Sequence, residues 1–181
     1  EPQARTEVVF TGPAEVNRRS QFELEVLAAV LELRLRDRLR EALSGTYGVA
    51  VNATALAAPY PHYLLRIGFG SAPGRADELR RAAFDEIARL ESEGATADEV
   101  AKVRETRRRQ LETGLTNNAY WTRALARAYE TGSDPRAILS EDDLIAQLTP
   151  ELVRHAARRY LPRDRYVVVV LQPADGQAGG Q

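Results

Sequence analysis

The sequence contains no cysteine among its 181 residues and only two histidines. Without cysteine, disulfide bonds, thiol catalysis and cysteine-ligated zinc sites are excluded. A catalytic zinc site needs three protein ligands, typically two histidines at helical spacing plus a carboxylate. His62 and His155 are far apart in the sequence, and neither has a histidine four residues away. Both H-E-x-x-H and H-x-x-E-H are therefore absent, and we expect this chain alone to bind no metal and to be inactive.

Sequence motifs of other catalytic and binding sites are also missing. The sequence has no G-x-S-x-G elbow for a nucleophilic serine and no glycine-rich phosphate loop. Lys and Arg total 25 against 26 acidic residues, so the net charge is -1, which gives no global electrostatic attraction to nucleic acid or anionic lipid. No apolar run approaches the ~20 residues of a membrane span. We therefore expect neither nucleic acid nor a membrane as a partner.

Two arginine-rich stretches could still suggest a nucleic-acid surface. They comprise Arg34, Arg36, Arg38 and Arg40, and then Arg104, Arg107, Arg108 and Arg109. Acidic residues interleave both stretches, so we interpret them as solvated helix faces with i,i+4 ion pairs.

The composition is that of one globular domain, with 44% hydrophobic and 28% charged residues. The chain lacks an initiator methionine, and its opening segment Glu1–Ala4 reads as the interior of a longer protein. We predict one domain over residues 1–172. The remainder, 173–181, is polar and glycine-rich, and we predict a disordered tail there.

Hydrophobic periodicity predicts an α+β fold. Alternating or continuous apolar residues predict strands over 6–11, 47–52, 63–69 and 166–172. Helical spacing and N-capping residues predict helices over about 18–43, 76–93, from 97 onward, 118–131, 142–148 and 150–160. The second and third strands should pair antiparallel. Strands collected early and helices later predict one largely antiparallel sheet covered by helices.

One segment differs in kind from the rest. Leu39–Val49 reads Leu-Arg-Glu-Ala-Leu-Ser-Gly-Thr-Tyr-Gly-Val. It resembles the signature of the C-terminal domain of pitrilysin-type (M16, inverted-zincin) peptidases, in which a helix ends in Leu-Arg-Glu and a Tyr opens the next strand seven residues after the Arg. Arg40 and Tyr47 match that pair. Glu1–Ala4 also resembles the Glu-Pro-Lys-Ala that introduces this domain in bacterial members, with Gln3 in place of Lys.

The resemblance implies the C-terminal, substrate-binding domain of a bacterial zinc metalloendopeptidase. A homologous half, in the same polypeptide or in a separate subunit, would carry the zinc, and none is expected in this chain. Arg40 and Tyr47 would hold a peptide or unfolded protein and help to polarise the scissile carbonyl. A guanidinium suits peptide carbonyls and carboxylates, and a phenol can donate to a developing oxyanion. The resemblance points to the periplasm and, failing that, to the cytoplasm.

Two other readings stay open. M16-like domains also serve as non-catalytic structural or partner subunits, and an H-x-x-E-H in the other half would decide between these roles. A generic interaction module would be favoured if Arg40 and Tyr47 pointed away from a common cleft. Tyr at a strand start is commonly a core residue, and Arg at a helix end commonly complements the helix dipole.

Overall fold

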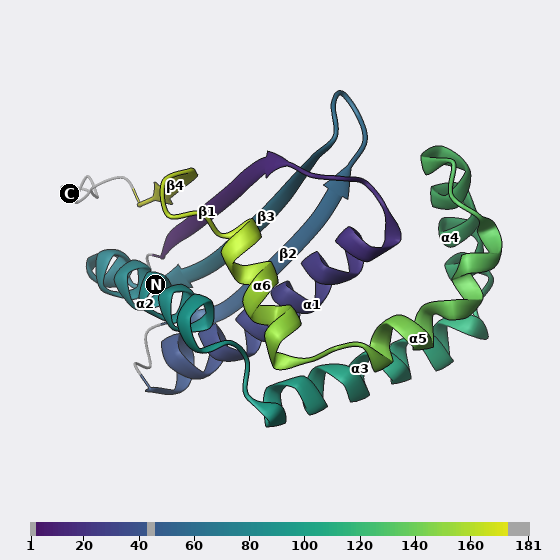
Figure 1. The fold of residues 1–181 in the computed structure, drawn as a ribbon. Helices are drawn as coiled ribbons and strands as arrows, with labels where there is room; N and C mark the ends of the chain where they lie inside the picture. The colour runs from purple at the N-terminus through teal and green to yellow at the C-terminus, as the bar shows by residue number, and fades with distance from the viewer. Residues whose placement is uncertain (1–2, 43–45, 174–181) are drawn as a thin grey trace, which may run out of the picture.

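A computed structural model describes residues 3–42 and 46–173, and within these the side chains of residues 40–42, 46 and 47 are not described. The α+β prediction is confirmed: one antiparallel sheet is covered by helices (Figure 1). The predicted tail falls outside the described residues apart from Pro173.

The sheet is formed by four strands within the described residues. They are β1 (Ala4–Pro13), β2 (Thr46–Leu56), β3 (His62–Ser71) and β4 (Tyr166–Leu171). The order across the sheet is β2-β3-β1-β4, and every neighbouring pair is antiparallel. All four strands were predicted, as was the pairing of the second with the third. The central place of β1 follows from long-range pairing that no local pattern reports.

The helices are α1 (Arg18–Leu35), α2 (Ala76–Glu93), α3 (Ala97–Leu115), α4 (Asn118–Thr131), α5 (Glu141–Ala146) and α6 (Pro150–Tyr160). Short 3₁₀ segments η2 (Pro73–Arg75) and η3 (Pro135–Ser140) were not predicted. Helices α1, α2 and α6 lie against one face of the sheet (Figure 1). Helix α4 projects from the end of α3 and stands away from the sheet (Figure 1).

The hydrophobic core is formed by residues that recur at the period of two in the strands and at the helical period in the helices. Alternate residues of the central strands, among them Phe10, Leu65 and Ile67, are fully buried beneath the helices. From the other side, Leu27 and Leu31 of α1 are fully buried at a spacing of one helical turn. The opposite face of the sheet carries the remaining, more exposed residues. No other element of the described chain covers that face (Figure 1).

The two edges of the sheet differ. Along β2, Glu32 Oε2 accepts from the Val51 N–H at 3.1 Å and Gln21 Oε1 accepts from the Ala55 N–H at 2.9 Å. These side chains of α1 satisfy backbone groups that would otherwise stay unpaired. Along β4, by contrast, Val167 and Leu171 are 60% and 64% exposed. Side chains of α1 therefore cover part of the β2 edge, whereas no described strand pairs with the outer edge of β4.

Local capping predictions are confirmed, and one helix boundary is corrected. Thr96 and Glu99 form a capping box at the start of α3, and Thr149 caps α6. The helix predicted to run to Leu43 is α-helical only to Leu35 and continues as a π-helix, η1 (Arg36–Ala42). Residues 43–45 lie outside the described chain. The buried spacing of Leu35 and Leu39 fits either kind of helix, so periodicity could not separate them.

Candidate functional site

The predicted pair Arg40 and Tyr47 belongs to two adjoining elements. Arg40 lies in the last part of η1, and Tyr47 is the second residue of β2. In the sheet, Thr46 pairs with Ser71 at the end of β3. The side chains of both predicted residues lie outside the described structure, so their convergence on a common cleft stays a prediction.

The segment that carries Arg40 is a π-helix, which the sequence did not reveal. Leu39 anchors it in the core with no exposed surface. Arg36 pairs with Glu32 one turn earlier at 2.6 Å, and Arg38 lies 3.9 Å from Glu86 of α2. π-helical turns are uncommon and are frequently found at functional sites. The π-helix therefore includes Arg40, the residue that the sequence motif had already indicated as functional.

The histidines do not form a metal site with other side chains. His62 opens β3, with its Nδ1 2.7 Å from the carbonyl oxygen of Tyr60, and His155 is exposed on α6. Among the residues that the structure describes, no three His, Asp or Glu side chains are grouped closely enough to hold a metal ion.

The two arginine-rich stretches are largely neutralised by ion pairs. Arg36 and Arg109 pair with acids four residues away on their own helices, as predicted. Arg107 instead pairs with Glu25 of α1 at 2.7 Å. Arg34 likewise reaches Glu99 on another helix. These two arginines therefore form ion pairs between helices α1 and α3. Spacing in the sequence could not identify partners that lie on another helix.

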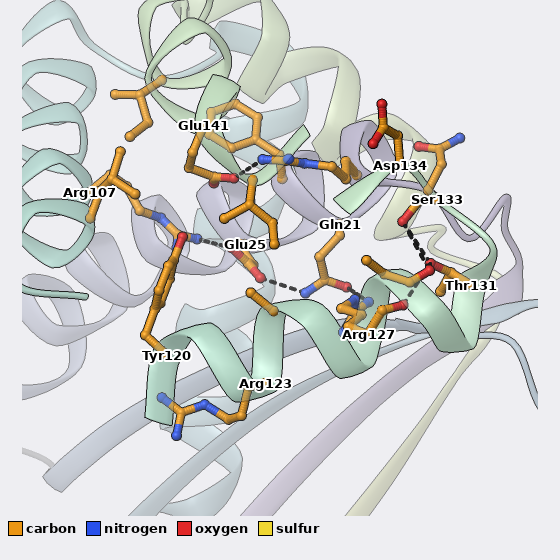
Figure 2. Close-up of a pocket in the computed structure, with 18 of the residues that line it drawn as sticks. Gln21, Glu25, Arg107, Tyr120, Arg123, Arg127, Thr131, Ser133, Asp134 and Glu141 are labelled. Atoms are coloured by element: carbon orange, nitrogen blue, oxygen red, sulfur yellow. Dashed lines mark hydrogen bonds and ion pairs between the residues drawn. The ribbon is translucent and has the colours of Figure 1, made fainter. Parts of the chain in front are cut away.

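Sequence reasoning missed a cavity of about 420 Å³ on the helical side. It lies between α1, α3, α4, η3 and α5 (Figure 2). Its apolar lining comprises Val16, Phe22, Leu111, Ala124, Ala128, Ile138 and Ile145. Because its walls come from segments more than 100 residues apart, no local motif could have signalled it.

Several of the charged and polar side chains that line the cavity pair with one another (Figure 2). Gln21 Nε2 donates to Glu25 at 2.6 Å, and Arg127 donates to Gln21 Oε1 at 2.8 Å. Arg18 forms an ion pair with Glu141 across the cavity wall. These pairs neutralise part of the charge that lines the cavity.

Tyr120 forms part of the cavity wall because Gly114 leaves room for its ring. A Cβ at Gly114 would lie 2.9 Å from Tyr120 Cδ2. Burial raises the pKa of the Tyr120 hydroxyl and the charge of Glu141 adds to this, so the phenol stays protonated. The described lining residues include no histidine. The Thr131 and Ser133 hydroxyls hydrogen-bond each other at 3.0 Å. No nucleophile–base pair of serine or threonine with histidine is therefore formed among the described lining residues.

Comparison with known proteins now gives the family. The model of the peptidase M16 inactive domain matches residues 1–107, more than half of the chain. The chain belongs to this family. As an M16 inactive domain it has the α+β fold that the sequence led us to expect of a C-terminal-type domain.

Individual similar proteins and structures are consistent with this family assignment. A zinc protease PQQL-like protein of Arabidopsis thaliana is 29% identical over 126 residues, covering 64% of this chain and 13% of that protein. The crystal structure of the periplasmic protease PqqL from Escherichia coli superposes with a TM-score of 0.80 at 22% identity, covering 96% of this chain and 19% of that one. A peptidase M16 inactive domain from Pseudomonas fluorescens gives a TM-score of 0.77 at 16% identity, covering 99% and 43%. This M16 inactive domain thus spans less than a fifth of the length of the first two proteins. No helix among its described residues is long and apolar enough to cross a membrane.

Proposed function

We propose that this M16 inactive domain holds the peptide substrate of a zinc-dependent metalloendopeptidase whose zinc is bound by a homologous half. The observation that carries the proposal is the placement of Arg40 and Tyr47 on the adjoining ends of η1 and β2 in a chain of this family. The likeness to proteins named zinc proteases supports the same assignment.

Each of the two residues has a distinct task in the proposed site. The Arg40 guanidinium donates to a main-chain carbonyl or carboxylate of the peptide and fixes its register. The Tyr47 hydroxyl donates to the scissile carbonyl oxygen, where negative charge develops in the transition state. The zinc of the partner half supplies the activated water. This division of labour accounts for a domain that keeps Arg40 and Tyr47 and lacks H-x-x-E-H.

The partner half is either part of the same polypeptide or a separate subunit. This chain spans less than a fifth of the Arabidopsis thaliana and Escherichia coli proteins, which leaves room for both arrangements. The substrate class is a peptide or an unfolded protein segment, because both proposed contacts are to main-chain groups. The periplasmic location of PqqL supports a periplasmic setting for this domain as well.

The test is cleavage of a fluorogenic peptide library by the zinc-bearing half, alone and with this chain added. We expect wild type to restore zinc-dependent cleavage, and Arg40→Ala or Tyr47→Phe to remove most of it, ~10²-fold or more for an oxyanion contact. Arg36→Ala is the matched control, since Arg36 is an exposed arginine of the same η1 segment. If the halves associate but cleavage is unchanged, the domain is a non-catalytic partner subunit.

A further inference from the structure

The cavity on the helical side has the size and the wall of a small-molecule site. Its volume of about 420 Å³ falls within the roughly 300–1,000 Å³ typical of such sites. Phe22, Ile138 and Ile145 of its lining are at most 7% exposed, so the core holds the apolar wall in place. Such a wall binds apolar surface by removing it from water. The cavity therefore suits a ligand with an apolar body.

The charged lining of the cavity is only partly paired. It contains four arginines, which are Arg18, Arg107, Arg123 and Arg127. The first two form ion pairs with Glu141 and Glu25. The other two lie on α4 and form no ion pair with a residue that the structure describes. The third acid of the lining, Asp134, accepts from the Arg136 N–H at 2.9 Å and points away from Arg127 (Figure 2). The α4 side of the cavity therefore has positive charge to offer an anion.

Arg127 is the unpaired cation that lies on the cavity side of α4 (Figure 2). Its Nη2 donates to Gln21 Oε1 at 2.8 Å and to the Ala55 carbonyl oxygen at 3.2 Å, which are both neutral acceptors. Its Nε and Nη1 have no acceptor within the described chain. A guanidinium held in this way can donate to a carboxylate with the remaining N–H groups. Arg123, in contrast, extends on the other side of α4 (Figure 2).

Tyr120 and Arg127 mark the length of the site along α4. They lie seven residues apart, which is two helical turns or about 10 Å. Arg127 is exposed, so a bound carboxylate would keep part of its contact with water at the mouth of the cavity. The Tyr120 hydroxyl stays protonated because burial raises its pKa, and a neutral phenol does not repel an anionic ligand. An apolar body can therefore extend from Arg127 towards Tyr120.

We propose that the cavity binds a small amphiphilic carboxylate of the fatty-acid type. Its carboxylate accepts from Arg127, and its apolar body lies against the wall that includes Phe22, Ile138 and Ile145. A ligand with several negative charges, such as a nucleotide, would also face Glu25 and Glu141, which line the same cavity. The site goes beyond the proposed peptide binding, because neither Arg40 nor Tyr47 lines it.

The test is isothermal titration calorimetry of the 181-residue chain with sodium octanoate, and with 1-octanol as the uncharged analogue. Arg127→Gln keeps an amide donor but removes the charge. We expect octanoate to bind at least about tenfold more weakly to this variant, and 1-octanol to bind as to wild type. Arg127→Lys keeps the charge and should lose less affinity than Arg127→Gln. Arg136→Gln is the matched control, because Arg136 is an exposed arginine of η3 outside the cavity lining.

A second variant tests the apolar part of the site. Ala124→Leu fills part of the cavity from α4 and should weaken the binding of both octanoate and 1-octanol. Thermal unfolding shows whether each variant is folded. Three results would overturn the proposal: no octanoate binding to wild type, equal octanoate binding to wild type and Arg127→Gln, or unchanged binding to a folded Ala124→Leu. Equal weakening by Arg127→Gln and Arg136→Gln would also overturn it, because the effect would then reflect net charge alone.

Discussion

Arg34 of α1 and Glu99 of α3 form a two-bond ion pair at the junction of three helices. Arg34 Nε donates to Oε1 at 2.7 Å and Nη2 to Oε2 at 3.0 Å. The same Nη2 donates to the carbonyl oxygen of Gly94 at 2.7 Å, and Glu99 Oε2 accepts from the Thr96 N–H at 2.7 Å. The side chains are only 11% and 18% exposed. One arginine therefore ties α1 to both the end of α2 and the cap of α3.

Replacing that arginine should destabilise the domain measurably. Arg34→Met keeps the bulk but leaves the Glu99 carboxylate partly buried without its counter-charge, so we expect a loss of about 2 kcal/mol in the free energy of unfolding. Urea unfolding measures it. Lys102→Ala is the control, because the Lys102–Asp98 pair is exposed and should contribute under about 0.5 kcal/mol. Equal losses in the two variants would contradict the assigned role of Arg34.

The same pair predicts a pH dependence. Burial alone would raise the pKa of Glu99, but hydrogen bonds from Arg34 and Thr96 outweigh it and lower the pKa from 4.5. A carboxyl whose pKa is lowered by folding contributes stability above its unfolded value and loses it as pH falls through the folded value. Wild type should therefore lose stability below about pH 4.5, and the gap to Arg34→Met should narrow there. Unfolding free energies measured in a pH series test this, and a constant gap would count against it.

Gly94 should not tolerate a side chain. Its φ of 80° and ψ of -170° belong to a region that essentially only glycine adopts, and a Cβ would lie 3.2 Å from the Pro150 carbonyl oxygen. Gly94→Ala should cost about 3 kcal/mol. Gly132→Ala, at a left-handed position with open space, should cost only about 1 kcal/mol. Thermal and urea unfolding give both values, and the reverse ranking would contradict the geometry.

The outer edge of β4, with which no described strand pairs, should make the isolated chain self-associate. The strand Tyr166–Leu171 has no charge and no proline, the usual protections of an edge. Val169→Lys places a charge beside Glu7, its partner in register, and should reduce concentration-dependent association. Leu139→Lys replaces a 74% exposed apolar residue of η3 and serves as the control. Light scattering over a concentration series measures the association of each variant. An equal effect of both variants would show that the association does not depend on β4.

Much of the fold was predictable because local sequence patterns determine where its helices and strands begin and end. The alternation in β3, the capping box at Thr96 and the Pro150 helix start each follow from interactions within a few residues. The order of the strands, the Arg34–Glu99 pair and the cavity depend on contacts between distant segments, which no local pattern contains. The π-helix at Arg36–Ala42 escaped because its buried leucines fit α-helical spacing. For the site, the motif predicted two residues, Arg40 and Tyr47, and their side chains lie outside the described structure.

The central claim is that this domain contributes to the transition state of a reaction whose zinc lies elsewhere. The most direct measurement is kcat and KM for peptide cleavage by the reassembled halves, with wild type and with Tyr47→Phe. The account predicts a kcat lowered by ~10²-fold or more with KM little changed, because the hydroxyl acts where charge develops. An unchanged kcat in a folded, associated variant would contradict it and leave the domain a structural partner.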